Sequence, residues 1–176
     1  SLNLRFKAFE ATTGVDEGPN AFNWTGVGNA KVTGGNLALD GTGDYITLGS
    51  DKHDWNFLLG QNSWTLEVWM DEWPTDANNV LIDTTAFSGS SPNTGLGIDI
   101  RSAGTVRIYQ TTGQHAAPRA DVTFTCTPVA GMNHLVIEYE HMDKGAAGVN
   151  SIRCGHNGDR VGMDDNSVVY LSYGDT

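Results

Sequence analysis

Short segments rich in Val, Ile, Thr and aromatic residues constrain the fold of this chain more than any other feature. They recur at intervals of roughly 8–15 residues, with Gly, Asn, Asp, Ser and Pro clustered between them. No long stretch carries the 3.6-residue periodicity of an amphipathic helix. The pattern predicts an all-β protein, built as a two-sheet antiparallel sandwich. The expected strands are 2–9, 30–39, 44–48, 63–71, 79–84, 95–101, 104–110, 120–126, 132–141, 149–155 and 167–173.

The segment 63–71 alternates between two faces, as a strand does. One row consists of Trp64, Leu66, Val68 and Met70, and we expect it between the two sheets. Trp69 belongs to the opposite row, where it either packs under a loop or lines a concave surface. We expect it to be covered, because exposed tryptophan is uncommon.

The segment 132–141 alternates in the same way. Leu135, Ile137 and Tyr139 should be buried, while His134 and the residues that alternate with it should face water.

Turn residues predict two hairpins. Gly104 favours a tight turn in the short connection 102–104. In the connection 155–158, Asn157-Gly158 can adopt positive φ at little energetic cost. The Gly- and Asn-rich stretch 10–29 is instead expected to cross the surface without forming a strand.

Length and charge exclude several classes of protein. A chain of 176 residues fits a single domain, predicted to span 1–176. The net charge of −11, with 10 Lys and Arg against 21 Asp and Glu, disfavours nucleic-acid partners and anionic membrane surfaces. No segment approaches the roughly 18 consecutive apolar residues of a membrane helix.

The two cysteines, Cys126 and Cys154, are too few for a disulfide framework or a zinc site. Both lie in strand-like sequence. We expect buried free thiols, with a single bridge as the alternative.

Two motifs resemble a known family. Leu37-Ala38-Leu39 runs into the turn Asp40-Gly41-Thr42-Gly43 and the pair Asp44-Tyr45. About 20 residues later comes Trp64-Thr65-Leu66-Glu67-Val68-Trp69. Together they resemble the laminin-G-like branch of the concanavalin A-like lectin and glucanase family. Weaker matches at 132–137 and 152–158 extend the resemblance over roughly residues 30–173.

This resemblance implies a concanavalin A-like jelly roll of a kind found in bacteriophage virion proteins and bacterial surface proteins. It implies a non-enzymatic structural or adhesive module, such as capsid decoration or a tail fibre, that is extracellular and on a virion surface. Its partners would be other virion or surface chains, further copies of itself, and cell-surface glycans. A secreted, lectin-like carbohydrate-binding module is the alternative.

The family normally closes with a further strand after the part equivalent to 168–173, which this chain lacks. Either the segment 2–9 or a neighbouring chain fills that place, or the chain is a segment of a longer protein.

Sugar binding requires an aromatic platform beside hydrogen-bonding side chains. The loop 72–79 offers Trp73 with Asp76 and Asn78, and Trp24 is a second candidate platform, as is the 111–119 loop. The alternative for Trp73 is that it plugs one end of the sandwich.

Calcium is the plausible ion, because many members of the family that the chain resembles bind it. Asp40 and Asp44, which flank the glycine turn, are the candidate ligands, with 164–166 as another oxygen-rich loop. Neither loop carries a complete ligand set, so the alternative is that Asp40 and Asp44 hydrogen-bond the turn backbone.

Glycoside hydrolases of this fold carry Glu-x-Asp-x-(x)-Glu on one strand, and their paired carboxylates flank the scissile bond. Here Glu67 is followed two residues later by Trp69 rather than Asp, and Asp71 and Glu72 point to opposite faces. We therefore expect no catalysis.

Overall fold

The computed structural model describes residues 12–15, 22–49, 58, 63–77, 79–84, 95–111, 120–141 and 151–164. The chain divides into two compact units, 1–54 and 55–176. A single domain over 1–176 therefore stays a prediction. The expected strands 2–9 and 167–173 lie outside the described residues.

The first unit contains a three-stranded antiparallel sheet in the order β1 (Thr13–Val15), β2 (Asn23–Val27) and β5 (Tyr45–Leu48). A separate hairpin joins β3 (Lys31–Thr33) to β4 (Asn36–Ala38). Gly34 and Gly35 turn this hairpin with φ of 60° and 86°, a conformation that glycine adopts without strain. The turn divides the single strand expected over 30–39 into two.

The expectation that 10–29 forms no strand is wrong, because β1 and β2 lie within it. Trp24 of β2 is buried and pairs across the strands with Gly14 of β1. A Cβ atom on Gly14 would lie only 2.8 Å from the Trp24 indole nitrogen, so the glycine leaves room for the ring. A glycine that looks like a strand breaker is thus required by its neighbour.

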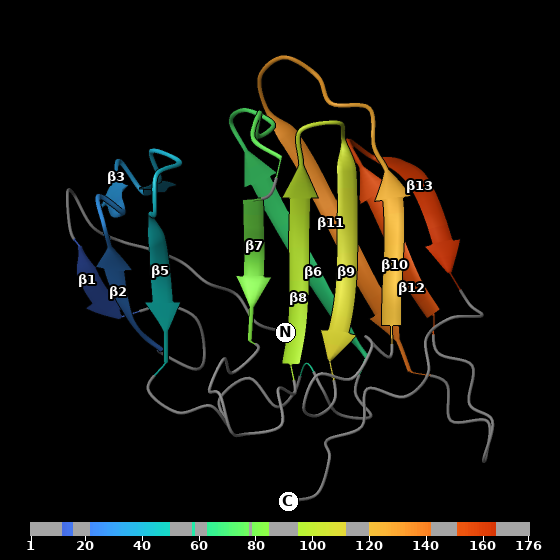
Figure 1. The fold of residues 1–176 in the computed structure, drawn as a ribbon, viewed down its shortest axis with the longest axis horizontal. Helices are drawn as coiled ribbons and strands as arrows, with labels where there is room; N and C mark the ends of the chain where they lie inside the picture. The colour runs from blue at the N-terminus through green and yellow to red at the C-terminus, as the bar shows by residue number, and fades with distance from the viewer. Residues whose placement is uncertain are drawn as a thin grey trace, which may run out of the picture. The chain divides into compact units, whose positions relative to one another are not determined.

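The described residues of the second unit form two four-stranded antiparallel sheets (Figure 1). The first has the order β10 (Ala120–Thr125), β9 (Thr105–Thr111), β8 (Gly95–Arg101) and β7 (Asn79–Asp83). The second has the order β13 (Asp159–Asp164), β12 (Ser151–His156), β11 (Asn133–Glu140) and β6 (Trp64–Met70). In Figure 1 the β7–β10 sheet lies in front of the other. The described residues form no α-helix, and none of their segments is a long apolar helix that could span a membrane.

Both sheets contribute to one hydrophobic core, which gives the unit a sandwich-like build. As expected, Trp64 is buried, and Leu66 and Met70 pack against the core. The alternation expected for 132–141 is also confirmed, since Leu135, Ile137 and Tyr139 on β11 are buried. The all-β prediction is therefore confirmed for the described residues.

Both turn predictions in this unit are confirmed. Gly104 has a φ of 78° between β8 and β9. Asn157 and Gly158, with φ of 51° and 87°, turn β12 into β13. The strand β13 was missed, because 159–164 lacks a run of β-branched or aromatic residues.

Candidate ligand-binding face

Trp73 does not offer a platform for a ligand. It is only 8% exposed and belongs to the hydrophobic core. Its indole N–H donates a 2.9 Å hydrogen bond to the carbonyl of Arg101, and its ring meets His156 edge-on at 5.4 Å between centroids. A buried indole with its polar atom satisfied is a packing residue, which is the alternative that the sequence left open.

The remaining residues of the predicted sugar site that the structure describes do not lie around an exposed ring. Asp76 is exposed, and its backbone carbonyl accepts hydrogen bonds from Ser102 N and from the Asn79 amide. Asn78 lies outside the described residues. Trp24 is only 2% exposed, within the first unit. Neither tryptophan therefore presents the exposed face that sugar stacking requires.

Asp40 and Asp44 hold the glycine turn together. Asp40 Oδ1 accepts from Thr42 N at 2.9 Å and Oδ2 from the Asn29 amide at 2.9 Å. Asp44 Oδ1 accepts from Asn29 N at 2.6 Å and Oδ2 from Asp40 N at 2.8 Å. The hydrogen bond from Asn29, with that from Thr42 N, lowers the pKa of Asp40. Each of the four carboxylate oxygens thus accepts a hydrogen bond, two of them from the backbone of the turn and two from Asn29.

Those hydrogen bonds give the two aspartates a structural role in the turn. In the part of the chain that the structure describes, no three His, Cys, Asp or Glu side chains group as metal ligands. Calcium also takes carbonyl oxygens, so that result does not bear on it, and calcium at Asp40 and Asp44 stays a prediction.

Among the described residues of the second unit, the large exposed aromatic side chain is that of Trp69, on the outer face of the β6–β11–β12–β13 sheet. Its side chain is 58% exposed, so the expectation of a covered ring is wrong. The ring stacks on His134 of β11, its cross-strand partner, with centroids 4.4 Å apart and planes 11° from parallel. Nothing among the described residues covers the opposite side of the indole enough to bury it.

A hydrogen-bonded turn holds His134 in place beneath Trp69. Asn157 of the β12–β13 turn accepts a 2.8 Å hydrogen bond from His134 N at its side-chain oxygen. Its own N–H donates a 2.9 Å bond to the His134 carbonyl. Asn157 can make both bonds because it adopts positive φ, which asparagine tolerates better than most residues. The stacked pair is therefore fixed to two strands and a turn.

Glu67 supplies a carboxylate beside the stacked rings. It lies two residues from Trp69 on the same face of β6, and half of its side-chain surface is exposed. One of its oxygens, Oε2, is 3.7 Å from His134 Nε2, which is an ion-pair distance when the imidazole is protonated. The group thus combines an open indole face with an acidic hydrogen-bond acceptor.

Met132, which directly precedes β11, extends this group. It is 61% exposed, and since Asn133 points into the core, strand alternation places Met132 on the same face as His134. Asn133 is fully buried and ties the 129–131 turn to the sheet, bonding Val129 N at 3.1 Å and the carbonyls of Val129 and Gly131 at 3.0 and 2.7 Å. We call Glu67, Trp69, Met132 and His134 the Trp69 face.

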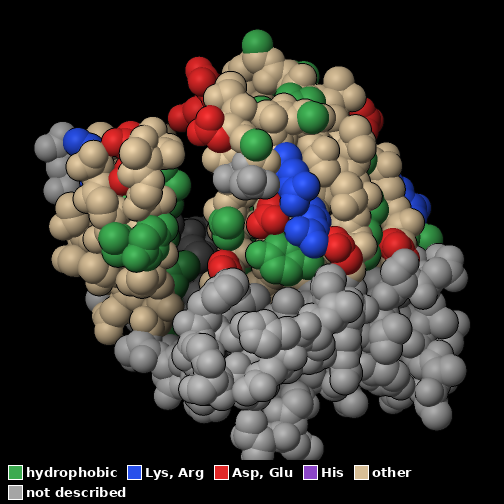
Figure 2. Space-filling model, in the orientation of Figure 1, with side chains coloured by type: hydrophobic (Ala, Val, Ile, Leu, Met, Phe, Trp, Pro, Cys, Tyr) green, Lys and Arg blue, Asp and Glu red, His purple; other side chains and the backbone are tan. Residues whose placement is uncertain are grey.

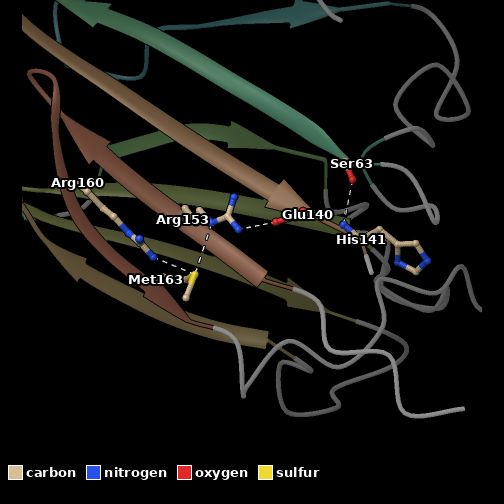
Figure 3. Close-up of polar contacts among 6 residues, drawn as sticks. All are labelled: Ser63, Glu140, His141, Arg153, Arg160 and Met163. Carbon is tan, nitrogen blue, oxygen red and sulfur yellow. Dashed lines mark hydrogen bonds and ion pairs between the residues drawn. The ribbon is translucent and has the colours of Figure 1, made fainter. Parts of the chain in front are cut away.

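Beyond the Trp69 face, the same sheet carries charged side chains on β11, β12 and β13 (Figure 3). Arg153 donates to Glu140 Oε2 at 2.5 Å and to the sulfur of Met163 at 3.5 Å. Arg160 donates to the same sulfur at 3.0 Å. This half of the surface is thus committed to internal contacts.

The outer face of the β7–β10 sheet is also occupied by internal contacts. Arg107 binds Asp121 through two hydrogen bonds of 2.7 Å and lies over the ring of Tyr109 at 4.9 Å. The hydrogen bond with Arg107 lowers the pKa of Asp121. Figure 2 shows this face, with basic side chains beside acidic ones. Burial raises the pKa of Asp99, against the opposing effect of Arg101 and Arg107.

No protein-family model matches the chain, and searches of curated proteins and of solved structures found no match. The laminin-G-like resemblance therefore remains an interpretation of its motifs.

The sequence contained a signal for the Trp69 face. Alternation in 63–71 placed Trp69 opposite the core row, and alternation in 132–141 placed His134 on a wet face. Pairing the two required the β6–β11 register, which sequence patterns do not supply.

Proposed function

We propose that this chain is a non-catalytic adhesive module that recognises glycans through the Trp69 face. The observation that carries the proposal is an indole left 58% exposed while stacked on a second ring in a rigid sheet. Burying that indole against a ligand removes apolar surface from water, which contributes roughly 25 cal/mol for each Å² covered.

A sugar fits the chemistry of this face. The axial C–H groups of a pyranose form a flat apolar patch that packs on an indole, while its hydroxyls donate to a carboxylate such as that of Glu67. Hydrogen bonds to a charged group contribute about 1.5–3 kcal/mol each. Because His134 and Asn157 hold the platform in place, little side-chain entropy is lost when a ligand binds.

The arrangement favours binding over hydrolysis. A retaining glycosidase needs a second carboxylate about 5–5.5 Å from the first. The side chain that lies at ion-pair distance from Glu67 is the imidazole of His134, and Asp71 lies beyond the end of β6. Glu67 is therefore assigned the role of a hydrogen-bond acceptor.

The wider setting follows from the motif resemblance. The module would be a concanavalin A-like jelly roll in a structural or adhesive protein on the exterior of a virion or cell. It would contact neighbouring chains, including further copies of itself. A secreted lectin-like protein would use the same face, and calcium at Asp40 and Asp44 would stabilise the first unit in either setting.

A printed array of bacterial and mammalian oligosaccharides tests this proposal. We expect the wild-type protein to bind a subset of glycans and Trp69→Ala to bind them at least about tenfold more weakly, a loss of roughly 1.4 kcal/mol. Glu67→Gln should weaken the same interactions, and Trp69→Phe should retain part of them because a ring remains.

Tyr45→Ala is the matched control, since Tyr45 is an aromatic residue of similar exposure, 53%, in the first unit. It should bind as the wild-type protein does. If wild-type protein binds no glycan, or if Trp69→Ala binds as well as wild type, the proposal is refuted.

A further inference from the structure

Cys126 and Cys154 come from opposite sheets and enter the same core. Cys126 directly follows β10, and its N–H donates a 2.8 Å hydrogen bond to the carbonyl of Gly104. Cys154 lies within β12, paired with Ile137 on one side and Gly162 on the other. Both are free thiols, only 3% and 1% exposed, in one hydrophobic cluster.

The two layers approach closely where these cysteines lie. A Cβ atom on Gly162, the cross-strand partner of Cys154, would lie 2.8 Å from the ring of Phe124. Phe124 and Cys126 are two residues apart and both are buried, so they point to the same side of their strand. Cys126 and Cys154 thus enter one core cluster from facing layers, and each thiol perturbs the pKa of the other.

We propose that Cys126 and Cys154 form an intrachain disulfide that joins the two sheets when the chain meets a disulfide donor. Two buried thiols that enter one core cluster from facing sheets meet the first geometric requirement of a bridge, which is that the side chains point toward one another. The site is separate from the Trp69 face, because Cys154 points into the core and Trp69 points outward.

The environment assigns different roles to the two sulfurs. The interaction of the two thiols lowers the pKa of Cys126 and raises that of Cys154, and burial raises the pKa of Cys154 further. Cys126 lies just past the end of β10, whereas Cys154 lies inside β12, so Cys126 is the thiol that a disulfide donor reaches first and we assign it as the nucleophile, a role with which its lowered pKa agrees.

The reaction is an ordinary thiol–disulfide exchange. The Cys126 thiolate attacks a small disulfide such as oxidised glutathione, forming a mixed disulfide and expelling one glutathione thiolate. Cys154 then loses its proton to that thiolate and attacks the Cys126 sulfur, releasing the second glutathione. Two protein thiols are oxidised and one glutathione disulfide is reduced to two thiols.

The bridge would close a loop of about 28 residues, and this restricts the unfolded chain. For a loop of this size and a protein of this length, we expect the midpoint of thermal unfolding to rise by about 10 °C.

The test compares wild-type protein refolded with oxidised glutathione and with a reducing agent. We expect the oxidised monomer to show no free thiols when denatured, and tryptic mapping to yield one peptide pair joined through Cys126 and Cys154. Its unfolding midpoint should rise and return to the reduced value on adding dithiothreitol.

Cys154→Ala is the control, because it removes the partner while leaving the nucleophile. After oxidation this variant should carry glutathione on Cys126 or form a dimer bridged through Cys126. Its midpoint of thermal unfolding should not rise. Two free thiols in the oxidised wild-type monomer, or bridges only between chains, would overturn the proposal. The comparison of oxidised and reduced wild-type protein decides the matter even if the variant fails to fold.

Discussion

Asn133 offers the sharpest test of how the core supports the Trp69 face. Its side chain is fully buried, and its amide bonds the 129–131 turn three times. Its oxygen also lies 3.0 Å from Nε2 of His156, which is itself buried. Replacing it by alanine removes all four hydrogen bonds at once.

The expected cost can be worked out from where these partners lie. Val129 and Gly131 are exposed, so water replaces the amide there and each lost bond costs about 0.5–1 kcal/mol. The ring nitrogen of His156 lies in the core, and leaving it unpaired costs about 1–3 kcal/mol. We therefore expect Asn133→Ala to lower the free energy of unfolding by about 3 kcal/mol, which corresponds to a midpoint about 10 °C lower.

Asn133→Asp separates hydrogen bonding from packing. It keeps the shape of the side chain, but at neutral pH its second oxygen faces the two carbonyls that the amide nitrogen now bonds. We expect Asn133→Asp to lower the free energy of unfolding about as much as Asn133→Ala does, as measured by thermal unfolding monitored by circular dichroism. If Asn133→Ala lowers the free energy of unfolding by less than about 1 kcal/mol, or if Asn133→Asp is as stable as the wild type, these hydrogen bonds are not what stabilises this part of the protein.

Two further predictions concern single side chains of the second unit. Gly97→Ala should cost about 1–3 kcal/mol, because its Cβ would overlap the ring of Tyr109. In a Tyr109→Ala background the same change should cost almost nothing, and equal costs in the two backgrounds, measured by urea unfolding, would contradict the steric explanation. Burial lowers the pKa of His156, so the unfolded chain binds its proton more readily and stability falls as the pH drops below the ordinary histidine value of 6.5. His156→Gln, whose amide can still donate to Asn133, should make this acid dependence shallower in melts between pH 7 and pH 5, and an unchanged slope would show that other groups cause it.

Local patterns predicted the strands of the second unit well. The row from Trp64 to Met70 and the row from Leu135 to Tyr139 alternate over enough residues to mark a half-buried strand. The first unit was harder to predict, because β1 to β5 are 3–5 residues long and carry glycine inside β1 and β2. Over such short runs a strand pattern and a loop pattern look alike.

The candidate site was predicted less well, and the reason is the same for each residue. Trp73 and Trp69 are both tryptophans near the end of one strand, yet one is 8% exposed and the other 58%. Trp73 is buried because it reaches the carbonyl of Arg101 and the ring of His156, which come from two distant segments. Neither contact has a signature near residue 73.

What the sequence by itself determined is the all-β character, the alternation of faces and the glycine and asparagine turns, because each depends on neighbours a few residues away. The tertiary structure alone decided which faces are covered. It also decided that the carboxylates of Asp40 and Asp44 bond backbone N–H groups and that Cys126 and Cys154 share one core cluster. Those outcomes depend on strand register and on how two sheets pack, and many combinations of register and packing satisfy the same local pattern. The exposed indole of Trp69 and the burial of Cys126 and Cys154 in one core cluster are both consequences of that packing.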